Sequence, residues 1–150
     1  MTDPEWTDPH CPVARTLDLL GDRWSLLIVR DAFDGVRRFN DFRRGLGIAR
    51  NILSDRLRAL IAVGVMEQRP NERGTRNEYV LTDKGRDLFT VVVALRQWGE
   101  RHAFEPGEEH SELLVLATGA PVPPVAPTAA DGTPLHAADT RVRKVGDPGE

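Results

Sequence analysis

Residues 37–58 read RRFNDFRRGLGIARNILSDRLR, and this stretch decides the fold. Its seven arginines and two aspartates give a local charge of +5 in a chain whose net charge is −3. Phe42 and Leu46 lie four residues apart, so they share one face of a helix. Gly45 and Gly47 then interrupt that helix. The stretch predicts two short helices that meet at a glycine turn and carry basic side chains on their outer surface.

The second of these helices is predicted from about Ala49 to Val63. Its apolar residues recur at i, i+4, i+7 and i+8, which directs them to a core; they are Leu53, Leu57, Leu60 and Ile61. The opposite face carries polar side chains, namely Asn51, Ser54, Asp55 and Arg58. Two helices joined in this way are typical of a helix-turn-helix, whose second helix enters the major groove of double-stranded DNA.

The segments before this pair predict two more helices. Apolar spacing after a proline predicts a helix over 12–20. Asp22 is predicted to cap the next helix, which ends near 33–35, and Asn40 is predicted to cap the one after it. The helix-turn-helix therefore rests on an amino-terminal helical layer.

The segments after the pair predict a wing. Residues 65–69 and 77–81 are strand-like runs around a polar loop. Thr82 is predicted to cap one long helix that reaches about His102. We expect a mainly α fold of the α+β class, a winged helix-turn-helix with a small β-hairpin.

The composition limits the class of protein. With 150 residues, 40% of them hydrophobic, the chain can form one core of about 100 residues plus a tail. It has no apolar run of about 18 residues and no secretory signal pattern, so we expect no membrane partner. Its single cysteine fits a reducing compartment, and we therefore expect a cytoplasmic protein. No nucleophile elbow, P-loop, zinc-protease motif or dinucleotide fingerprint is present, and the histidines do not cluster. We therefore expect no enzyme, no cofactor and no metal site.

The chain resembles the HxlR-type winged-helix transcriptional regulators, which are relatives of the MarR-type repressors. The matching motifs are CPV at 11–13, GDRWSLLI at 21–28, RFNDF at 38–42, NILSDRL at 51–57, GV at 64–65, EYxLTxxG at 78–85 and LxxWG at 95–99, where x is any residue. The resemblance implies a homodimer that binds a pseudo-palindromic operator, with helices from both chain ends at the two-fold axis. Together with the change of composition near residue 106, it divides the chain into an arm (1–10), a DNA-binding and dimerisation domain (11–105) and a Pro/Gly-rich extension (106–150).

Base contacts, phosphate contacts and wing contacts are expected from different residues. The side chains predicted to reach bases are Arg50, Asn51, Ser54 and Arg58, because Arg and Asn bind guanine and adenine bidentately. Those predicted to hold phosphates are Arg38, Asn40 and Arg43. Arg73 and Arg76 in the wing loop are predicted to approach the minor groove. Some arginines must instead pair with acids, and Arg56 is the candidate for that role.

Two features depart from the family pattern. Relatives usually carry a serine at the position of Ala49, where a hydroxyl would cap the recognition helix; alanine supplies no such contact. Some relatives have a tail like a zinc ribbon, but here TG at 118–119 and AADG at 129–132 replace its cysteine motifs. The extension instead reads as extended chain or a small β-hairpin, with a turn at 130–133 and an alternating run at 141–145; the last residues, 146–150, are expected to be mobile.

Regulation leaves alternatives open. Cys11 is either a redox sensor or a small packing residue at the dimer interface, and the sequence favours packing. Trp24, Phe89 and Trp98 are either core or the lining of an effector cavity. The rival to a DNA-binding regulator is a small-molecule-binding protein that uses the dimer cavity of the same scaffold, and a third reading is a protein-interaction module.

Overall fold

The computed structural model describes residues 5–149 and consists of two compact units that divide between Phe89 and Thr90. Residues 1–4 of the predicted arm and Glu150 of the predicted mobile end lie outside the described residues. The domain boundary predicted near residue 105 rests on composition and stays a prediction. The residue contacts of the structure divide the chain at an earlier point than this predicted boundary, at the start of α6.

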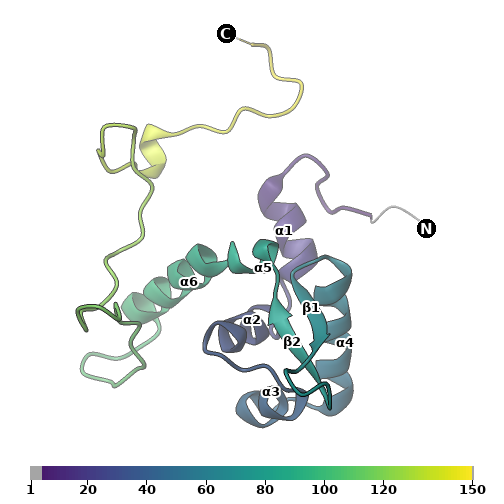
Figure 1. Cartoon of the computed structure of the whole chain (residues 1–150). Helices are drawn as coiled ribbons and strands as arrows, with labels where there is room; N and C mark the ends of the chain where they lie inside the picture. The colour runs from purple at the N-terminus through teal and green to yellow at the C-terminus, as the bar shows by residue number, and fades with distance from the viewer. Residues whose placement is uncertain (1–4, 150) are drawn as a thin grey trace. The chain divides into compact units, whose positions relative to one another are not determined.

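Four helices form the body of the first unit (Figure 1): α1 (Pro12–Leu20), α2 (Ser25–Phe33), α3 (Phe39–Leu46) and α4 (Arg50–Ala62). Helices α2, α3 and α4 pack on one another. Their fully buried side chains are Ile28, Val29, Phe42, Leu53, Leu57 and Leu60. The predicted helix-turn-helix and its apolar spacing are therefore confirmed.

The caps of these helices agree with the sequence in one case and disagree in two. Asp22 was predicted to cap α2, but the cap position is Trp24, which makes no side-chain cap bond. Asp22 lies two residues earlier, where its carboxylate accepts hydrogen bonds from the backbone N–H groups of Trp24 and Ser25 at 2.9 and 3.0 Å and so holds the start of the helix as a capping side chain would. Ala49 precedes α4 with no side-chain cap, as expected. The prediction for Asn40 was wrong: the extended backbone ends at Arg38, so Asn40 already lies in the first turn of α3.

The wing is an antiparallel hairpin of β1 (Met66–Pro70) and β2 (Asn77–Leu81), with Met66 opposite Leu81 and Pro70 opposite Asn77. Both predicted strands are confirmed, the first displaced by one residue. Strand β1 packs on α4 and β2 packs on α2. The backbone N–H of Tyr79 donates to the carbonyl oxygen of Arg37 at 2.8 Å, so the segment before α3 runs beside β2.

The single long helix predicted after Thr82 was wrong. Thr82 does cap a helix, but α5 (Asp83–Arg86) ends after four residues and α6 (Phe89–His102) begins anew. Two side chains bind α5 to the hairpin region: Lys84 Nζ donates to the Val63 carbonyl at 2.6 Å, and Arg86 Nη1 donates to the Leu81 carbonyl at 2.8 Å. Gly85 packs so closely on the Val65 carbonyl that a Cβ would overlap it. The contacts of Lys84 and Gly85 reach residues about twenty positions earlier and hold the short helix against the hairpin region.

The second unit contains α6 and the carboxyl-terminal extension. Gln97 binds the extension with both ends of its amide: Nε2 donates to the Pro123 carbonyl at 3.0 Å, and Oε1 accepts from the Val125 N–H at 2.7 Å. The extension forms isolated bridges, Leu114 with Pro121 and Thr128 with Pro134, and residues 141–145 contain no strand. None of the helices among residues 5–149 is long and apolar enough to cross a membrane.

Candidate nucleic-acid interface

The polar face of α4 forms a surface concavity of about 660 Å³. Its lining comprises Phe39, Arg50, Asn51, Ser54, Asp55 and Arg58. Leu53, Leu57 and Leu60 are buried on the other side of the helix, so the core fixes which side chains face outward. All four residues predicted to reach bases therefore lie together on one accessible surface.

The arginines of this concavity are held loosely. The Arg50 guanidinium lies 5.5 Å from the centroid of the Phe39 ring, which is within cation–π range. Arg58 Nη2 donates to Ser54 Oγ at 3.1 Å and lies 3.8 Å from an Asp55 carboxylate oxygen. Exposed ion pairs contribute only about 0–1 kcal/mol, so exchanging Asp55 for a phosphate or a base costs little.

A second concavity, of about 490 Å³, joins the start of α3 to the wing loop. It is lined by Arg37, Arg38, Asn71, Glu72, Arg73, Thr75, Arg76 and Glu78. Three of the predicted phosphate and wing residues, Arg38, Arg73 and Arg76, thus come together here. Their clustering creates a basic surface although the chain as a whole is acidic.

The wing loop is shaped by Asn71. Its side-chain oxygen accepts from the Thr75 N–H at 3.0 Å, and its own N–H donates to the Arg76 carbonyl at 2.8 Å. Gly74 closes the loop with a φ of 67°, a left-handed conformation that favours glycine. These bonds present Arg73 and Arg76 on a defined turn.

Asn40 and Arg43 lie apart from these two concavities. Both are exposed on α3, and neither lines either concavity. Their neighbour Arg44 pairs with Asp41 at 2.6 Å, so the acid in this helix is already occupied by another arginine. An outward position on the first helix of the motif is compatible with phosphate contact.

Sequence reasoning missed Arg37, Phe39, Asn71 and Thr75. Of these four residues, only Arg37 could have been selected from the sequence, because it belongs to the arginine-rich stretch 37–58. Phe39 has no polar atom and would be assigned to the core by any hydropathy rule. The Asn71–Thr75 pair depends on loop closure, which residue spacing alone does not reveal.

Arg56 behaves as a structural arginine, as predicted. Its Nη1 lies 3.6 Å from the Asp22 carboxylate and links α4 to the start of α2. Burial of the Asp22 carboxyl opposes ionisation, but hydrogen bonds from the Ser25 hydroxyl and from the N–H groups of Ser25 and Trp24, with the charge of Arg56, lower its pKa below the ordinary 3.8. The charged carboxylate therefore orients the helix that supports the motif.

The candidate regulatory residues occupy different settings. Cys11 is half-buried, and its Sγ accepts from the Ala14 N–H at 3.4 Å at the start of α1. Trp24 lies under the Arg23 guanidinium, Phe89 contacts Phe33 edge-on with ring centroids 5.5 Å apart, and Trp98 lies beside His102. Within residues 5–149, no three His, Cys, Asp or Glu side chains are arranged to hold a metal ion.

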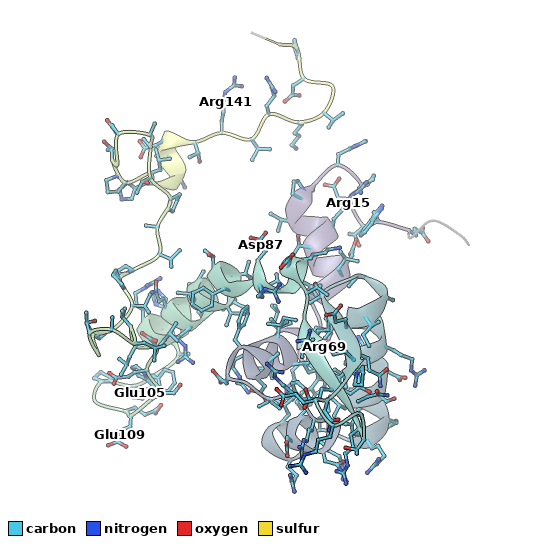
Figure 2. The ribbon with its side chains drawn as sticks, viewed as in Figure 1. Arg15, Arg69, Asp87, Glu105, Glu109 and Arg141 are labelled. Atoms are coloured by element: carbon cyan, nitrogen blue, oxygen red, sulfur yellow. The ribbon has the colours of Figure 1, made fainter. Side chains whose placement is uncertain are left out.

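Figure 2 shows the side chains of the first unit crowded around its helices and hairpin, with Arg69 marked on the hairpin. Basic residues of α3, α4 and the wing loop thus share this unit with the apolar core that positions them. The arrangement supplies guanidinium and amide groups on the accessible surface of a helical scaffold. Such groups suit phosphates and base edges.

Known proteins match both the sequence and the fold. The HxlR-like helix-turn-helix family matches residues 19–106. An uncharacterized HTH-type transcriptional regulator of Mycobacterium tuberculosis is 50% identical over 95 residues, which cover 63% of this chain but only 60% of that relative's length. YybR of Bacillus subtilis, described in the same words, is 37% identical over 92 residues, which cover 60% of this chain and 74% of YybR.

Solved structures extend the likeness. The crystal structure of PA1607, a candidate transcription factor, is 54% identical with a TM-score of 0.88 and covers 91% of this chain and 96% of PA1607. The redox regulator HypR in its reduced form is 35% identical with a TM-score of 0.57 and covers 62% of this chain and 94% of HypR. With the family match over more than half of its length, the chain belongs to the HxlR-like helix-turn-helix family.

Proposed function

We propose that this protein is a transcriptional regulator that binds a pseudo-palindromic DNA operator as a homodimer in the cytoplasm. The observation that carries the proposal is the concavity on α4, where Arg50, Asn51, Ser54 and Arg58 face outward together. Leucines on the opposite face of α4 are buried in the core, and this packing keeps the four polar side chains on the accessible face of the helix. The family relationship supports the same function.

Each group of residues has a distinct role in this proposal. Arg50 and Asn51 read bases through bidentate hydrogen bonds, each worth about 1–3 kcal/mol of discrimination. Arg38, Asn40 and Arg43 hold phosphates, while Arg73 and Arg76 extend the wing toward the minor groove. Arg37 joins the phosphate group because it shares the concavity of Arg38 and the wing loop.

A homodimer supplies two recognition helices for successive major grooves, which are separated by about 34 Å. Large apolar side chains are exposed on both helices that the family resemblance assigns to the interface. They are Val13 and Leu17 on α1, and Val91, Leu95 and Trp98 on α6. Exposed apolar residues repeated on a helix face are typical of an interaction surface.

The decisive experiment identifies the bound sequence by selection from random DNA and then measures affinity across a salt series. The wild type should bind with a steep salt dependence, because phosphate contacts release counterions. Arg50→Ala and Asn51→Ala should each weaken binding about tenfold or more. Arg101→Ala, an exposed arginine on α6, is the matched control and should leave affinity unchanged.

Absent or salt-insensitive binding would instead favour the rival, a small-molecule-binding protein on the same scaffold. Titration of ligands against the region of Trp24, Phe89 and Trp98 would then become the relevant measurement. Retained DNA affinity in both α4 variants would reassign DNA contact to the wing and α3. A partner protein captured through the same face would favour the interaction module.

Regulation through Cys11 is a further part of the proposal. The thiol lies at the start of α1, a helix with exposed apolar residues, so an adduct on Sγ would alter packing there. Mass spectrometry and gel shift after mild oxidant treatment test this role. A Cys11→Ser variant that responds to oxidant like the wild type contradicts it.

A further inference from the structure

A third concavity, of about 370 Å³, lies on the first unit where the end of α2, strand β2 and α5 meet. Phe33, Val36 and Tyr79 contribute apolar and aromatic surface to it. Its size falls within the range of about 300–1,000 Å³ that small-molecule sites occupy. Of the residues proposed to contact DNA, Arg37 alone contributes to its lining.

The charged groups that line this concavity are all cationic. They are Arg37, Arg69 and Arg86, and no acidic residue belongs to the lining. Three guanidinium groups around an aromatic and aliphatic floor suit a ligand with a carboxylate attached to a flat apolar body. A neutral ligand would gain no charge-assisted hydrogen bond from these arginines, and a cationic ligand would be repelled by them.

Two of the three arginines are held weakly by the acids that pair with them. Arg69 lies 3.9 Å from Glu67, and Arg86 pairs with Asp83, whose side chain is almost fully exposed. Such exposed pairs contribute only about 0–1 kcal/mol, so a ligand carboxylate can replace them. Arg37 lies 3.6 Å from Glu78, whose side chain is only 17% exposed, so the ligand carboxylate must offset the loss of that contact when it draws Arg37 away.

The concavity adjoins both the wing-loop concavity and the start of α6. Arg37 lines it and also lines the basic concavity of the wing loop. Phe33 contacts Phe89, the first residue of α6, with ring centroids 5.5 Å apart. A ligand that draws the Arg37 guanidinium inward therefore removes a cation from the DNA-facing concavity.

We propose that this concavity is the effector site and that it binds a small aromatic carboxylate, which lowers DNA affinity by withdrawing Arg37. The regulatory half of this inference rests on the proposed function, whereas the binding half does not. The site differs from the predicted cavity of Trp24, Phe89 and Trp98, none of which lines it. The site would select ligands that combine a negatively charged carboxylate with a flat aromatic ring.

The competing occupant is the DNA backbone itself, since arginines on a wing strand can also bind phosphate. Arg69 separates the two, because it lines this concavity and not the one of the wing loop. The enclosure by Phe33 and Val36 favours an organic acid, because a phosphate gains nothing from apolar contact.

Tyr79 offers a direct reporter, because it is the only tyrosine in the sequence. Protein labelled with 3-fluorotyrosine should give one ¹⁹F resonance, which is followed while 2-naphthoate is added up to millimolar concentration. The resonance should shift and saturate with 2-naphthoate, and 2-naphthamide, which has the same shape without the charge, should bind at least about tenfold more weakly.

Two variants locate the effect. Arg69→Gln should weaken 2-naphthoate binding at least about fivefold, and circular dichroism should confirm that the variant is folded. Arg23→Gln removes an exposed arginine that is not part of the lining and should bind like the wild type. Saturating 2-naphthoate should also lower operator affinity several-fold in the wild type and leave Arg69→Gln unaffected.

The outcomes separate this inference from the proposed function. If the wild type binds DNA but its resonance does not shift, or shifts equally with the amide, the effector site is wrong and the regulator stands. If Arg69→Gln weakens DNA binding while 2-naphthoate produces no shift, the arginines serve DNA. If the ligand binds without changing operator affinity, the regulatory half is overturned. If no DNA binds at all, the proposed function fails while the ligand measurement is still valid.

Discussion

Asp22 holds the start of α2 by accepting hydrogen bonds from the Trp24 and Ser25 N–H groups and from the Ser25 hydroxyl. We predict that Asp22→Ala lowers the free energy of unfolding by about 1 kcal/mol at neutral pH, the usual cost of losing a helix cap. Urea unfolding followed by circular dichroism measures this loss. The supporting helix α2 should be the part that loosens.

The same substitution has a defined pH dependence. Because the folded pKa of Asp22 is lowered, its stabilisation is complete above the ordinary value of 3.8 and is lost as the pH falls through the folded pKa. The difference between wild type and variant should therefore shrink at acidic pH. Asp87→Ala, which removes an exposed carboxylate marked in Figure 2, is the control and should change the free energy of unfolding little at neutral pH. A difference that is constant with pH would refute the assignment.

At the residue scale, the spacing of apolar residues predicted which side chains face outward better than it predicted which backbone groups they bind. The leucine repeat of α4 assigned Arg50, Asn51 and Arg58 to one surface, because burial depends on helical period alone. Asn40 failed as a cap because the start of a helix depends on where the backbone leaves the extended region, here at Arg38. A good capping side chain two residues later could not move that point.

The turn between α3 and α4 depends on two glycines with different roles. Gly47 has a φ of 64° and ends α3 in the left-handed conformation, whereas Gly45 lies inside the helix. We predict that Gly47→Ala destabilises the protein by about 1–2 kcal/mol. Thermal and urea unfolding check this value, and DNA affinity should fall because the turn sets the angle of α4.

Gly45→Ala is the matched comparison. Its added Cβ would lie 3.7 Å from Asp31 Oδ2, an ordinary contact, and alanine favours helix over glycine. This variant should be neutral or more stable by up to about 1 kcal/mol. Equal destabilisation by both substitutions would show that crowding and not backbone conformation controls the turn.

At the element scale, the sequence predicted every helix of the helix-turn-helix and both wing strands, because each has a clear period and a turn signal. It failed at the break between α5 and α6, where helical spacing continues across Asp87 and Leu88. Helix α5 is held by contacts with residues about twenty positions earlier, such as Lys84 with Val63. A local pattern contains no information about them.

The whole molecule leaves much apolar surface exposed in a single chain. Leu95 and Trp98 on α6 are 54% and 60% exposed, and Val13 and Leu17 on α1 are exposed even more. No periodicity rule predicts this, because the same leucine spacing suits a core and an interface. Only the family resemblance, which places helices from both chain ends at a two-fold axis, led us to expect it.

We predict that the wild type is a dimer and that Leu95→Glu dissociates it, because a charge on the apolar face of α6 would be buried without a partner. Sedimentation velocity measures the change. Leu116→Glu is the matched control: Leu116 is fully exposed in the extension, outside any helix, and a charge there should leave the dimer intact.

Dissociation should affect DNA binding in a way that depends on the target. A dimer engages two half-sites at once, so Leu95→Glu should weaken binding to a full operator far more than binding to an isolated half-site. Equal loss on both targets would indicate misfolding of α4 and not loss of pairing. A wild type that sediments as a monomer, or a Leu95→Glu variant that remains dimeric, would remove α6 from the interface and leave its exposed face to another partner.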